Sequence, residues 1–166
     1  MQFHERELGI NKLPEKAGPL VRLAPRVGFT TLPVPEAFNW DEAWKDLKLP
    51  SAYGVFFRST RLPDADIEEL TRFDDLAHED AAGQPGFIEY FKGPIVEGNL
   101  DNLSFCLWED RDAARNASSR DQHTAASSIA GKMYSSFRLE KFDIVYNKFE
   151  KVIFTPVIAT ISGSHN

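Results

Sequence analysis

The sequence predicts one α+β domain whose strands and helices follow the order β-α-β-β-α-β. Two observations lead to this fold class. From Tyr53 onwards, segments with strand-like and helical apolar patterns follow one another regularly. The 166 residues are 42% hydrophobic and 12% aromatic, which is enough to build a buried core. We place this domain at residues 51–166 and treat residues 1–50 as an N-terminal arm.

The arm is rich in proline, and its first part is expected to be extended. Six of the ten prolines lie in it, at positions 14, 19, 25, 33, 35 and 50. A short helix is predicted near its end, where Asn39 and Glu42 have the spacing of a capping box. Trp40, Trp44 and Leu47 form one apolar stripe on that helix. We consider the arm either a strap across the domain or a partner subunit, or a lid over a pocket.

The domain elements can be assigned from their apolar periods and from turn residues. Strands are expected at residues 53–61, 87–92, 103–109 and 137–146, and a fifth is considered at 151–158. One helix is expected to begin at Pro63-Asp64 and to run to about Ala82, where glycines and a proline follow. Asp110 is expected to cap a second helix through Ala117, which restarts at Ser119 and runs to about residue 135.

This order is that of the ferredoxin-like unit, with helices on one face of the sheet. Both faces of the predicted strands carry apolar residues, since Val55 and Phe57 alternate with Phe56. A sheet covered on one face only would alternate more cleanly between apolar and polar residues. The second face therefore needs a cover, and a second copy of the sheet would supply it. We expect a homodimer.

The chain resembles the dimeric α/β-barrel superfamily, in which two such sheets close into a shared barrel. It is similar to a fungal protein family within that superfamily. The resemblance covers about residues 53–146, and the residues that carry it are Phe57 to Asp64, Asp75 to Glu79, Cys106-Leu107-Trp108, His123 and Met133-Tyr134. It implies a pocket between sheet and helices. Members of the superfamily include cofactor-free monooxygenases, polyketide cyclases, dehydratases, haem-degrading enzymes and proteins without known chemistry.

Composition argues against several classes of function. A net charge of −6 and a pI near 5.2 argue against nucleic-acid binding, which needs a basic surface. No apolar run approaches the roughly 20 residues that span a bilayer, so no membrane partner is expected. The N-terminal residues are charged where a signal peptide would be apolar. Cys106 is the only cysteine, which favours a reducing compartment, and we expect a cytoplasmic protein.

The helix after Pro63 carries the first candidate catalytic residues. Asp74 falls inside its apolar stripe, and His78 lies four residues further at the edge of that stripe. Asp74 is therefore expected to hold the His78 ring, to fix its tautomer and to raise its pKa, which would make His78 a general base. The alternative is a structural pair at the helix edge.

His123 is the third catalytic candidate, in the first turn after Ser119. The helix dipole disfavours a cation there, so its ring is expected to tend towards neutral. Its helical face continues to Tyr134, a candidate substrate-binding residue. A histidine that only bonds the backbone at the helix start is the alternative.

The remaining substrate-binding candidates lie on strands: Arg58, Phe57, Phe91, Cys106 and Trp108. Arg58 is either the cross-strand ion partner of Glu140 or a group that binds a substrate carboxylate or enolate. Trp108 is core or pocket wall, and Cys106 is small core filling, because a nucleophilic role needs a base that is not adjacent in sequence.

Neither a cofactor nor a metal site is expected. His78, His123 and Asp74 make a short ligand list without a recognised metal spacing, and glycine-rich phosphate loops are absent from the sequence. We therefore expect an enzyme without a cofactor, acting by cyclisation, isomerisation (a pericyclic step included) or dehydration on a small apolar metabolite in an aromatic-lined pocket. A cofactor-free monooxygenase and a non-catalytic dimeric protein that binds a ligand or partner are the alternatives.

Overall fold

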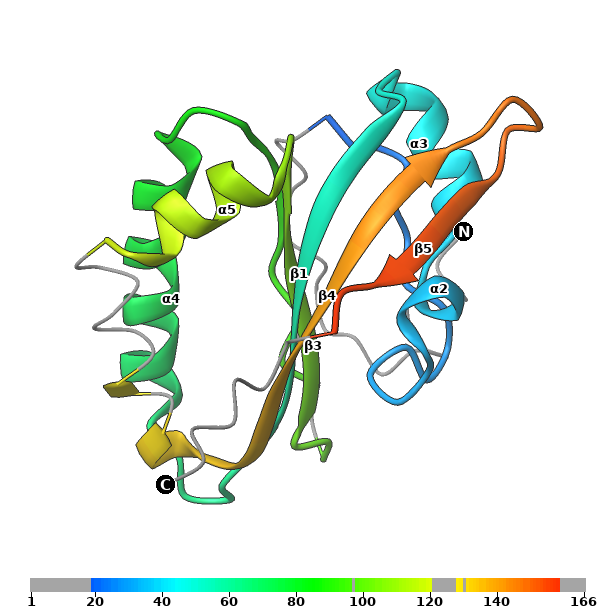
Figure 1. The fold of residues 1–166 in the computed structure, drawn as a ribbon. Helices are drawn as coiled ribbons and strands as arrows, with labels where there is room; N and C mark the ends of the chain where they lie inside the picture. Colours follow the sequence, from blue (N-terminus) through cyan, green and yellow to red (C-terminus); the bar gives the residue numbers. More distant parts are fainter. Residues whose placement is uncertain (1–18, 97, 121–127, 130, 159–166) are drawn as a thin grey trace, which may run out of the picture.

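The structure, a computed structural model, describes residues 19–96, 98–120, 128–129 and 131–158. Its elements in chain order are α2 Val34–Ala37, α3 Trp40–Leu47, β1 Ser51–Arg61, α4 Ile67–Ala82, β2 Phe87–Phe91, β3 Asp101–Trp108, α5 Arg111–Ser118, β4 Tyr134–Tyr146 and β5 Val152–Pro156. Figure 1 shows the sheet standing between two groups of helices.

All strand pairs in the five-stranded sheet are antiparallel, and the strand order is β2-β3-β1-β4-β5. The first four strands have the ferredoxin-like order, and β5 extends the sheet beside β4. The predicted α+β, ferredoxin-like fold is therefore confirmed. The fifth strand that was considered at the end of the chain is present, although it is shorter than the segment 151–158.

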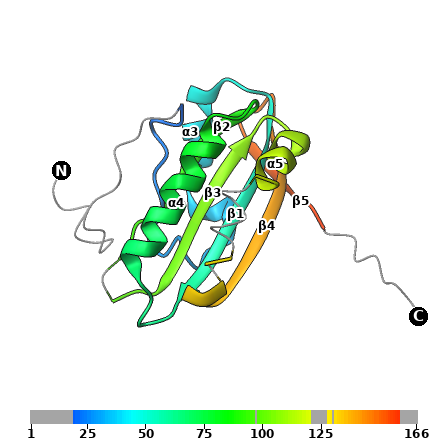
Figure 2. The same cartoon turned by 90° about the vertical axis from the view of Figure 1, so that its left-hand side faces the viewer.

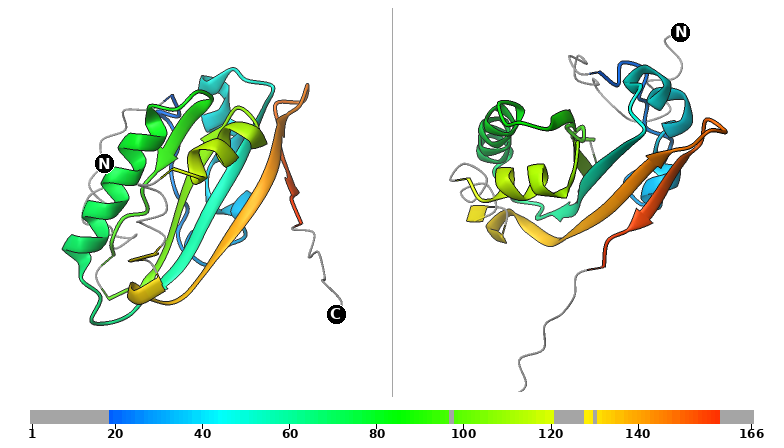
Figure 3. Two further views of the ribbon diagram at one scale, coloured as in Figure 1. Left: turned by 60° about the vertical axis from the view of Figure 1, so that its left-hand side comes forward. Right: turned by 45° about the horizontal axis from the view of Figure 1, so that its top comes forward.

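The helices α4 and α5 lie on one face of the sheet, as expected (Figures 1 and 2). We call this the helix face. Helix α4 contacts β2, and α5 contacts β1 and β3. Strands β4 and β5 extend beyond both helices (Figure 3). Their helix-face side chains are consequently more exposed than those of β1 and β3.

The opposite face is covered by residues 19–50, so we call it the arm face. Trp40 and Trp44 are 3% and 0% exposed, and Phe38 is 1% exposed. These side chains share one core cluster with sheet residues such as Phe56 and Phe105, whose rings pack against Trp40 at 5.9 and 5.3 Å between centroids. The cover that the second face needs is thus the chain's own arm.

This arrangement removes the reason for which a homodimer was expected. The arm occupies the sheet face that a second copy would have covered, so a shared barrel through that face does not follow from the structure. Homodimerisation stays a prediction and needs another surface. The described part of the arm is a strap on its own domain, on the other side of the sheet from α4 (Figure 3, right).

Helix capping differs in part from the predictions. Asn39 precedes α3, but its side chain does not cap that helix. Its amide instead accepts from Ala24 N at 2.7 Å and donates to Arg22 O at 2.9 Å, which fixes the preceding turn of the arm. Helix α4 begins at Ile67 rather than at Pro63, because the Asp66 carboxylate accepts from Glu69 N and caps it there.

The expected cap of the following helix is present, with the Asp110 carboxylate accepting from Ala113 N at 2.8 Å. Ser119, which was expected to restart the helix, instead ends α5, and its hydroxyl donates to Asn116 O at 2.8 Å. Most of the predicted continuation lies outside the described residues, but its end is wrong: Tyr134 begins β4, where it pairs with Arg61 of β1. Within the described part of the chain, no helix has the length and hydrophobicity needed to cross a membrane. The cytoplasmic location stays a prediction.

Candidate active site between helix α4 and the sheet

Helix α4 packs against β2 and buries none of its residues fully. The layer between this helix and the sheet is therefore half open. Its sheet side is formed by residues of one strand parity, because alternate side chains share a face. Tyr90 on β2 pairs with Cys106 on β3, which pairs with Val55 on β1. The groups in this layer are therefore Asp74 and His78 from above and Tyr90 and Cys106 from below.

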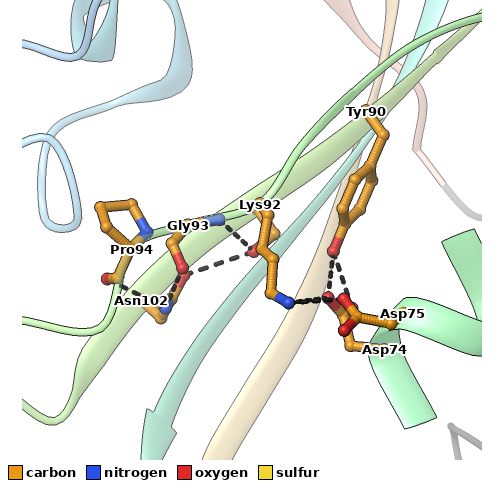
Figure 4. A network of polar contacts seen from close by, with 8 residues as sticks. Asp74, Asp75, Tyr90, Lys92, Gly93, Pro94 and Asn102 are labelled. Atoms are coloured by element: carbon orange, nitrogen blue, oxygen red, sulfur yellow. Dashed lines mark hydrogen bonds and ion pairs between the residues drawn. The ribbon is translucent and has the colours of Figure 1, made fainter. Parts of the chain in front are cut away.

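Asp74 and Tyr90 form the central polar contact of the layer (Figure 4). The Tyr90 hydroxyl donates to the Asp74 carboxylate, at 2.7 Å from Oδ1 and 2.6 Å from Oδ2. Lys92 Nζ lies 3.9 Å from Asp74 Oδ2 and binds the neighbouring Asp75 at 2.6 Å. Burial raises the pKa of Asp74, although the Tyr90 hydrogen bond and the Lys92 charge oppose this shift. Burial and the Asp74 charge also raise the pKa of Tyr90 well above its usual value, so the phenol remains a donor.

His78 lies beside this pair, against aromatic rings. Its imidazole is 4.2 Å from the Tyr90 ring and 6.0 Å from the Phe87 ring, centroid to centroid. The expected rise in its pKa is wrong in direction. Burial lowers the pKa of His78, and the charge of Asp74 offsets this only in part. The donor to Asp74 is Tyr90 rather than His78, so Asp74 does not fix the imidazole tautomer by a hydrogen bond.

Cys106 and Trp108 line the sheet side of the layer. Burial, together with the charge of Asp74, raises the pKa of the Cys106 thiol to about 12, so the side chain stays a neutral thiol. This fits its assignment as filling and not as a nucleophile. Trp108 is 3% exposed and packs against Phe87 at 5.4 Å, which places it in the core beneath α5.

Phe57 and Tyr134 lie further along the helix face, at the β1–β4 pair. Their rings are 5.4 Å apart, and Phe137 contacts both. Burial raises the pKa of Tyr134, with a further contribution from the charge of Asp74 and an opposing one from Arg61. Tyr134 therefore lies within electrostatic reach of both charged groups. The structure brings these two substrate-binding candidates to the same face as Asp74.

Arg58 and Phe91 do not join this site, because both point to the arm face. The Arg58 guanidinium binds Glu140 Oε2 at 2.8 Å, as the cross-strand alternative predicted. It also donates to the carbonyls of Thr30 at 2.5 Å and Leu32 at 2.9 Å, so the arm accepts hydrogen bonds from both of its terminal nitrogens. Phe91 is 5% exposed and stacks on Phe105 in the arm-face core. Neither can contact a ligand held beneath α4.

Tyr90 is the residue that sequence patterns alone did not single out. Its partner Asp74 lies on another element, 16 residues away, and no local spacing links them. A signal was nevertheless available: Asp74 falls in an apolar stripe, so a buried donor had to face it from the sheet. On the predicted strand 87–92, Tyr90 and Phe91 point to opposite faces of the sheet, so the Tyr90 hydroxyl could be that donor.

The loop that leaves β2 beneath this site depends on a glycine. A Cβ on Gly93 would lie 1.8 Å from Asn102 Oδ1 and 2.5 Å from Leu103 O. Asn102 Nδ2 donates to Gly93 O at 3.0 Å, and Gly93 N donates to Ser104 Oγ at 3.0 Å (Figure 4). These bonds hold the start of the loop flat against β3.

No group of three potential metal ligands occurs within the described ranges. Asp74 and His78 supply two potential ligands, and both carboxylate oxygens of Asp74 already accept a hydrogen bond from the Tyr90 hydroxyl. His123, the third catalytic candidate, lies outside the described residues.

A comparison of the sequence with models of protein families identifies the family of this chain. Residues 17–156 match the family model described as PB2B2.08-like. The chain belongs to this family. The match includes the arm from residue 17, whereas the resemblance inferred from the sequence began only near residue 53. No curated protein sequence matches the chain.

Solved structures with TM-scores of 0.50 or more share the fold at low sequence identity. Protein SO0527 from Shewanella oneidensis is 13% identical with a TM-score of 0.51, and the match covers 63% of this chain and 95% of that one. A conserved protein from Methanosarcina mazei Go1 is 13% identical with a TM-score of 0.50, covering 55% and 91%. SnoaB from Streptomyces nogalater, a cofactor-independent oxygenase, is 17% identical with a TM-score of 0.45, covering 54% and 90%.

Proposed function

We propose that this protein is a cofactor-independent enzyme that moves a proton on a small apolar metabolite in the layer beneath α4. The reaction classes that suit such a site are isomerisation, cyclisation and dehydration, each of which requires a proton to leave or reach carbon or oxygen. The Asp74–Tyr90 pair and the His78 ring are the proposed acid–base groups.

One observation carries the proposal. The pKa of Asp74 is raised and that of His78 is lowered, so the two groups, four residues apart on one helix, approach each other in acidity. General acid–base catalysis is most efficient when the pKa of the group lies near the working pH. A structural ion pair would shift the two values in the opposite directions, away from each other.

Each residue has a distinct proposed role. Asp74 keeps 42% of its side chain exposed, so a ligand can reach the carboxylate that Tyr90 orients. As a base, Asp74 takes the substrate proton. The neutral His78 imidazole then donates to, or accepts from, the atom where charge develops. Phe87, Phe57 and Tyr134 provide aromatic walls that orient an apolar substrate.

The test detects proton movement on any small molecule that the protein accepts. The purified protein is incubated in D₂O with a small-molecule extract of its source cells, and mass spectrometry records compounds that gain deuterium or change mass. We expect such compounds with the wild type, and a loss of about 100-fold or more in their rate of labelling with Asp74→Asn. His78→Gln should also slow labelling.

The matched control is Asp112→Asn, since the Asp112 carboxylate on α5 is 82% exposed. It should label the same compounds at the wild-type rate. If Asp74→Asn and His78→Gln also label at that rate, the acid–base proposal is wrong. If no compound is labelled or converted by the wild type, the non-catalytic binding protein becomes the better account.

His123 remains a third candidate for this chemistry on sequence grounds alone. Its substitution belongs in the same series, because a neutral histidine at a helix start is suited to donate to a substrate carbonyl.

A further inference from the structure

A hollow of about 320 Å³ is lined by residues of the connection between β1 and α4 and by residues 95, 96 and 98–100. Figure 1 shows this connection at the lower end of the molecule. The walls of the hollow are largely apolar, with Leu62, Ile67, Ile95, Val96 and Leu100 among them. Ile67, Ile95 and Leu100 are each 37–45% exposed. Exposed apolar side chains that gather around a concavity are typical of a ligand site.

One charged side chain, Arg61, lies in this wall, and it is only 6% exposed. A guanidinium stays charged, and burial of a charge is costly without a partner of opposite sign. Arg61 NH2 donates to the carbonyl of Asn99 at 3.0 Å. Among the described residues, no carboxylate forms an ion pair with it. The sequence analysis gave Arg61 no functional role, although it lies in the segment Phe57 to Asp64; at the end of β1 it pairs with Tyr134 of β4.

Besides the bond to Asn99, no hydrogen bond joins the Arg61 guanidinium to another described residue. Every fully buried side-chain nitrogen or oxygen of the described residues has a hydrogen-bond partner. The Arg61 nitrogens that have none therefore keep some exposed surface, and Arg61 is one of the residues that line the hollow. Arg61 consequently offers unused donors at the floor of an apolar hollow.

We propose that this hollow binds the carboxylate of a small organic acid, with the acid's apolar body against the surrounding side chains. The planar guanidinium matches a carboxylate, which it can bind through two parallel hydrogen bonds. A single cation in an apolar wall is neutralised by one negative charge, which favours a monocarboxylate over a phosphate dianion. The volume lies at the lower end of the roughly 300–1,000 Å³ found for small-molecule pockets.

Helix α4 carries residues of both the hollow and the candidate active site. Ile67 lines the hollow, and Asp74 lies seven residues further on the same helical face, about 10 Å along the axis. An acid anchored at Arg61 would lie beside the first turn of the helix that carries Asp74. That the bound acid is the substrate rests on the proposed function, whereas the binding itself does not.

The test measures binding of octanoate by titration calorimetry and by methyl NMR signals of Ile67, Val96 and Leu100. We expect octanoate to bind, and the isosteric neutral octanamide to bind at least about tenfold more weakly, since charge-assisted hydrogen bonds are lost. Arg61→Gln should weaken octanoate by a similar factor. Arg72→Gln, which removes an exposed arginine of α4, is the matched control and should bind as the wild type does.

Several outcomes would overturn the proposal. Octanoate that fails to bind the wild type at about 10 mM, or that binds no better than octanamide, excludes a carboxylate site even if Arg61→Gln does not fold. Tighter binding of octyl phosphate than of octanoate would show a phosphate site instead.

Asp74→Asn separates the two proposals. It should bind octanoate with wild-type affinity while it loses labelling in D₂O. Asp74→Asn that still labels at the wild-type rate would refute the acid–base proposal and leave the carboxylate site standing. Wild-type protein that labels compounds but does not bind octanoate would refute the carboxylate site alone.

Discussion

The pKa values of Asp74 and His78 beneath α4 are shifted more by desolvation than by the charges of neighbouring groups. For both Asp74 and His78, burial is the largest cause of the pKa shift, and it disfavours the charged form in each case. The shift is upward for the acid and downward for the base. Tyr90 then supplies the hydrogen bond that keeps the carboxylate in place.

These opposite shifts predict opposite pH dependences of stability. The unfolded chain protonates His78 near pH 6.5, above the lowered pKa of the folded protein, so wild-type stability should fall as pH decreases below 6.5. The unfolded chain ionises Asp74 near pH 3.8, below the raised folded pKa, so wild-type stability should fall as pH increases above 3.8. His78→Gln and Asp74→Asn should each lack their own contribution.

Urea unfolding of the wild type and both variants across pH 3–8 measures these differences. The free energy of unfolding of the wild type relative to His78→Gln should rise with pH, and relative to Asp74→Asn it should fall. Asp112→Asn provides the reference for loss of an exposed carboxylate. Curves for both test variants that run parallel to that of the wild type would contradict the burial of these two groups.

At the scale of elements, the arm makes a larger contribution to the core than its position outside the ferredoxin-like unit suggests. Trp44 on α3 is 0% exposed, and its indole N–H donates to Leu49 O at 2.9 Å. Asp41 on the same helix accepts from Val152 N at 2.8 Å, which ties α3 to β5. Helix α3 is therefore a structural element of the sheet's second layer.

Trp44→Ala should lower the free energy of unfolding by about 3–5 kcal/mol, because it leaves a large cavity in a packed core. Denaturant unfolding at fixed pH measures this loss. Phe149→Ala, at a position that is 71% exposed, should cost less than about 0.5 kcal/mol. A loss for Trp44→Ala as small as that of the control would mean that the arm is attached loosely, as a lid would be.

The secondary-structure elements show which parts of the fold could be predicted from the sequence. The periods of apolar residues were sufficient for β1, α4, β2, β3, α5 and β4, since those patterns are local. What they could not reveal was the partner of each apolar face. The sequence showed that Trp40 and Trp44 had to be buried, yet it did not say against which face. It placed Asp74 and His78 on one helix, but the Tyr90 contact and the direction of the His78 shift depend on packing from β2.

At the scale of the whole molecule, several exposed apolar side chains lie on the helix face of β4 and β5. Phe137, Leu139, Val145 and Ile153 are between 47% and 55% exposed there. They lie on one face because Leu139 pairs with Phe57 and Val145 pairs with Ile153, and side chains of paired residues point the same way. Lys141 and Asp143 lie between Leu139 and Val145 on the same face, so the apolar residues form one group at each end of β4. We call these four residues together the β4–β5 patch.

The homodimer predicted from the sequence should use this patch, since the arm covers the other face of the sheet. A patch of this kind on an open sheet edge is typical of contact with another chain, and a two-fold contact would bury the patch of both copies. We expect a dimer in light scattering after size exclusion, and a shift to monomer with Leu139→Asp. Val27→Asp, at an arm position that is 69% exposed, should leave the dimer intact.

The possible results test the existence of the dimer and the location of its contact surface independently. A wild type that is monomeric at all concentrations would refute the homodimer. A dimer that Leu139→Asp leaves unchanged would keep self-association and exclude the β4–β5 patch as its contact. Phe137 packs against both Phe57 and Tyr134, so a second copy on this patch would also close the open side of the candidate active site. Dissociation by Leu139→Asp should therefore slow the D₂O labelling proposed for Asp74, although the substitution lies on another element.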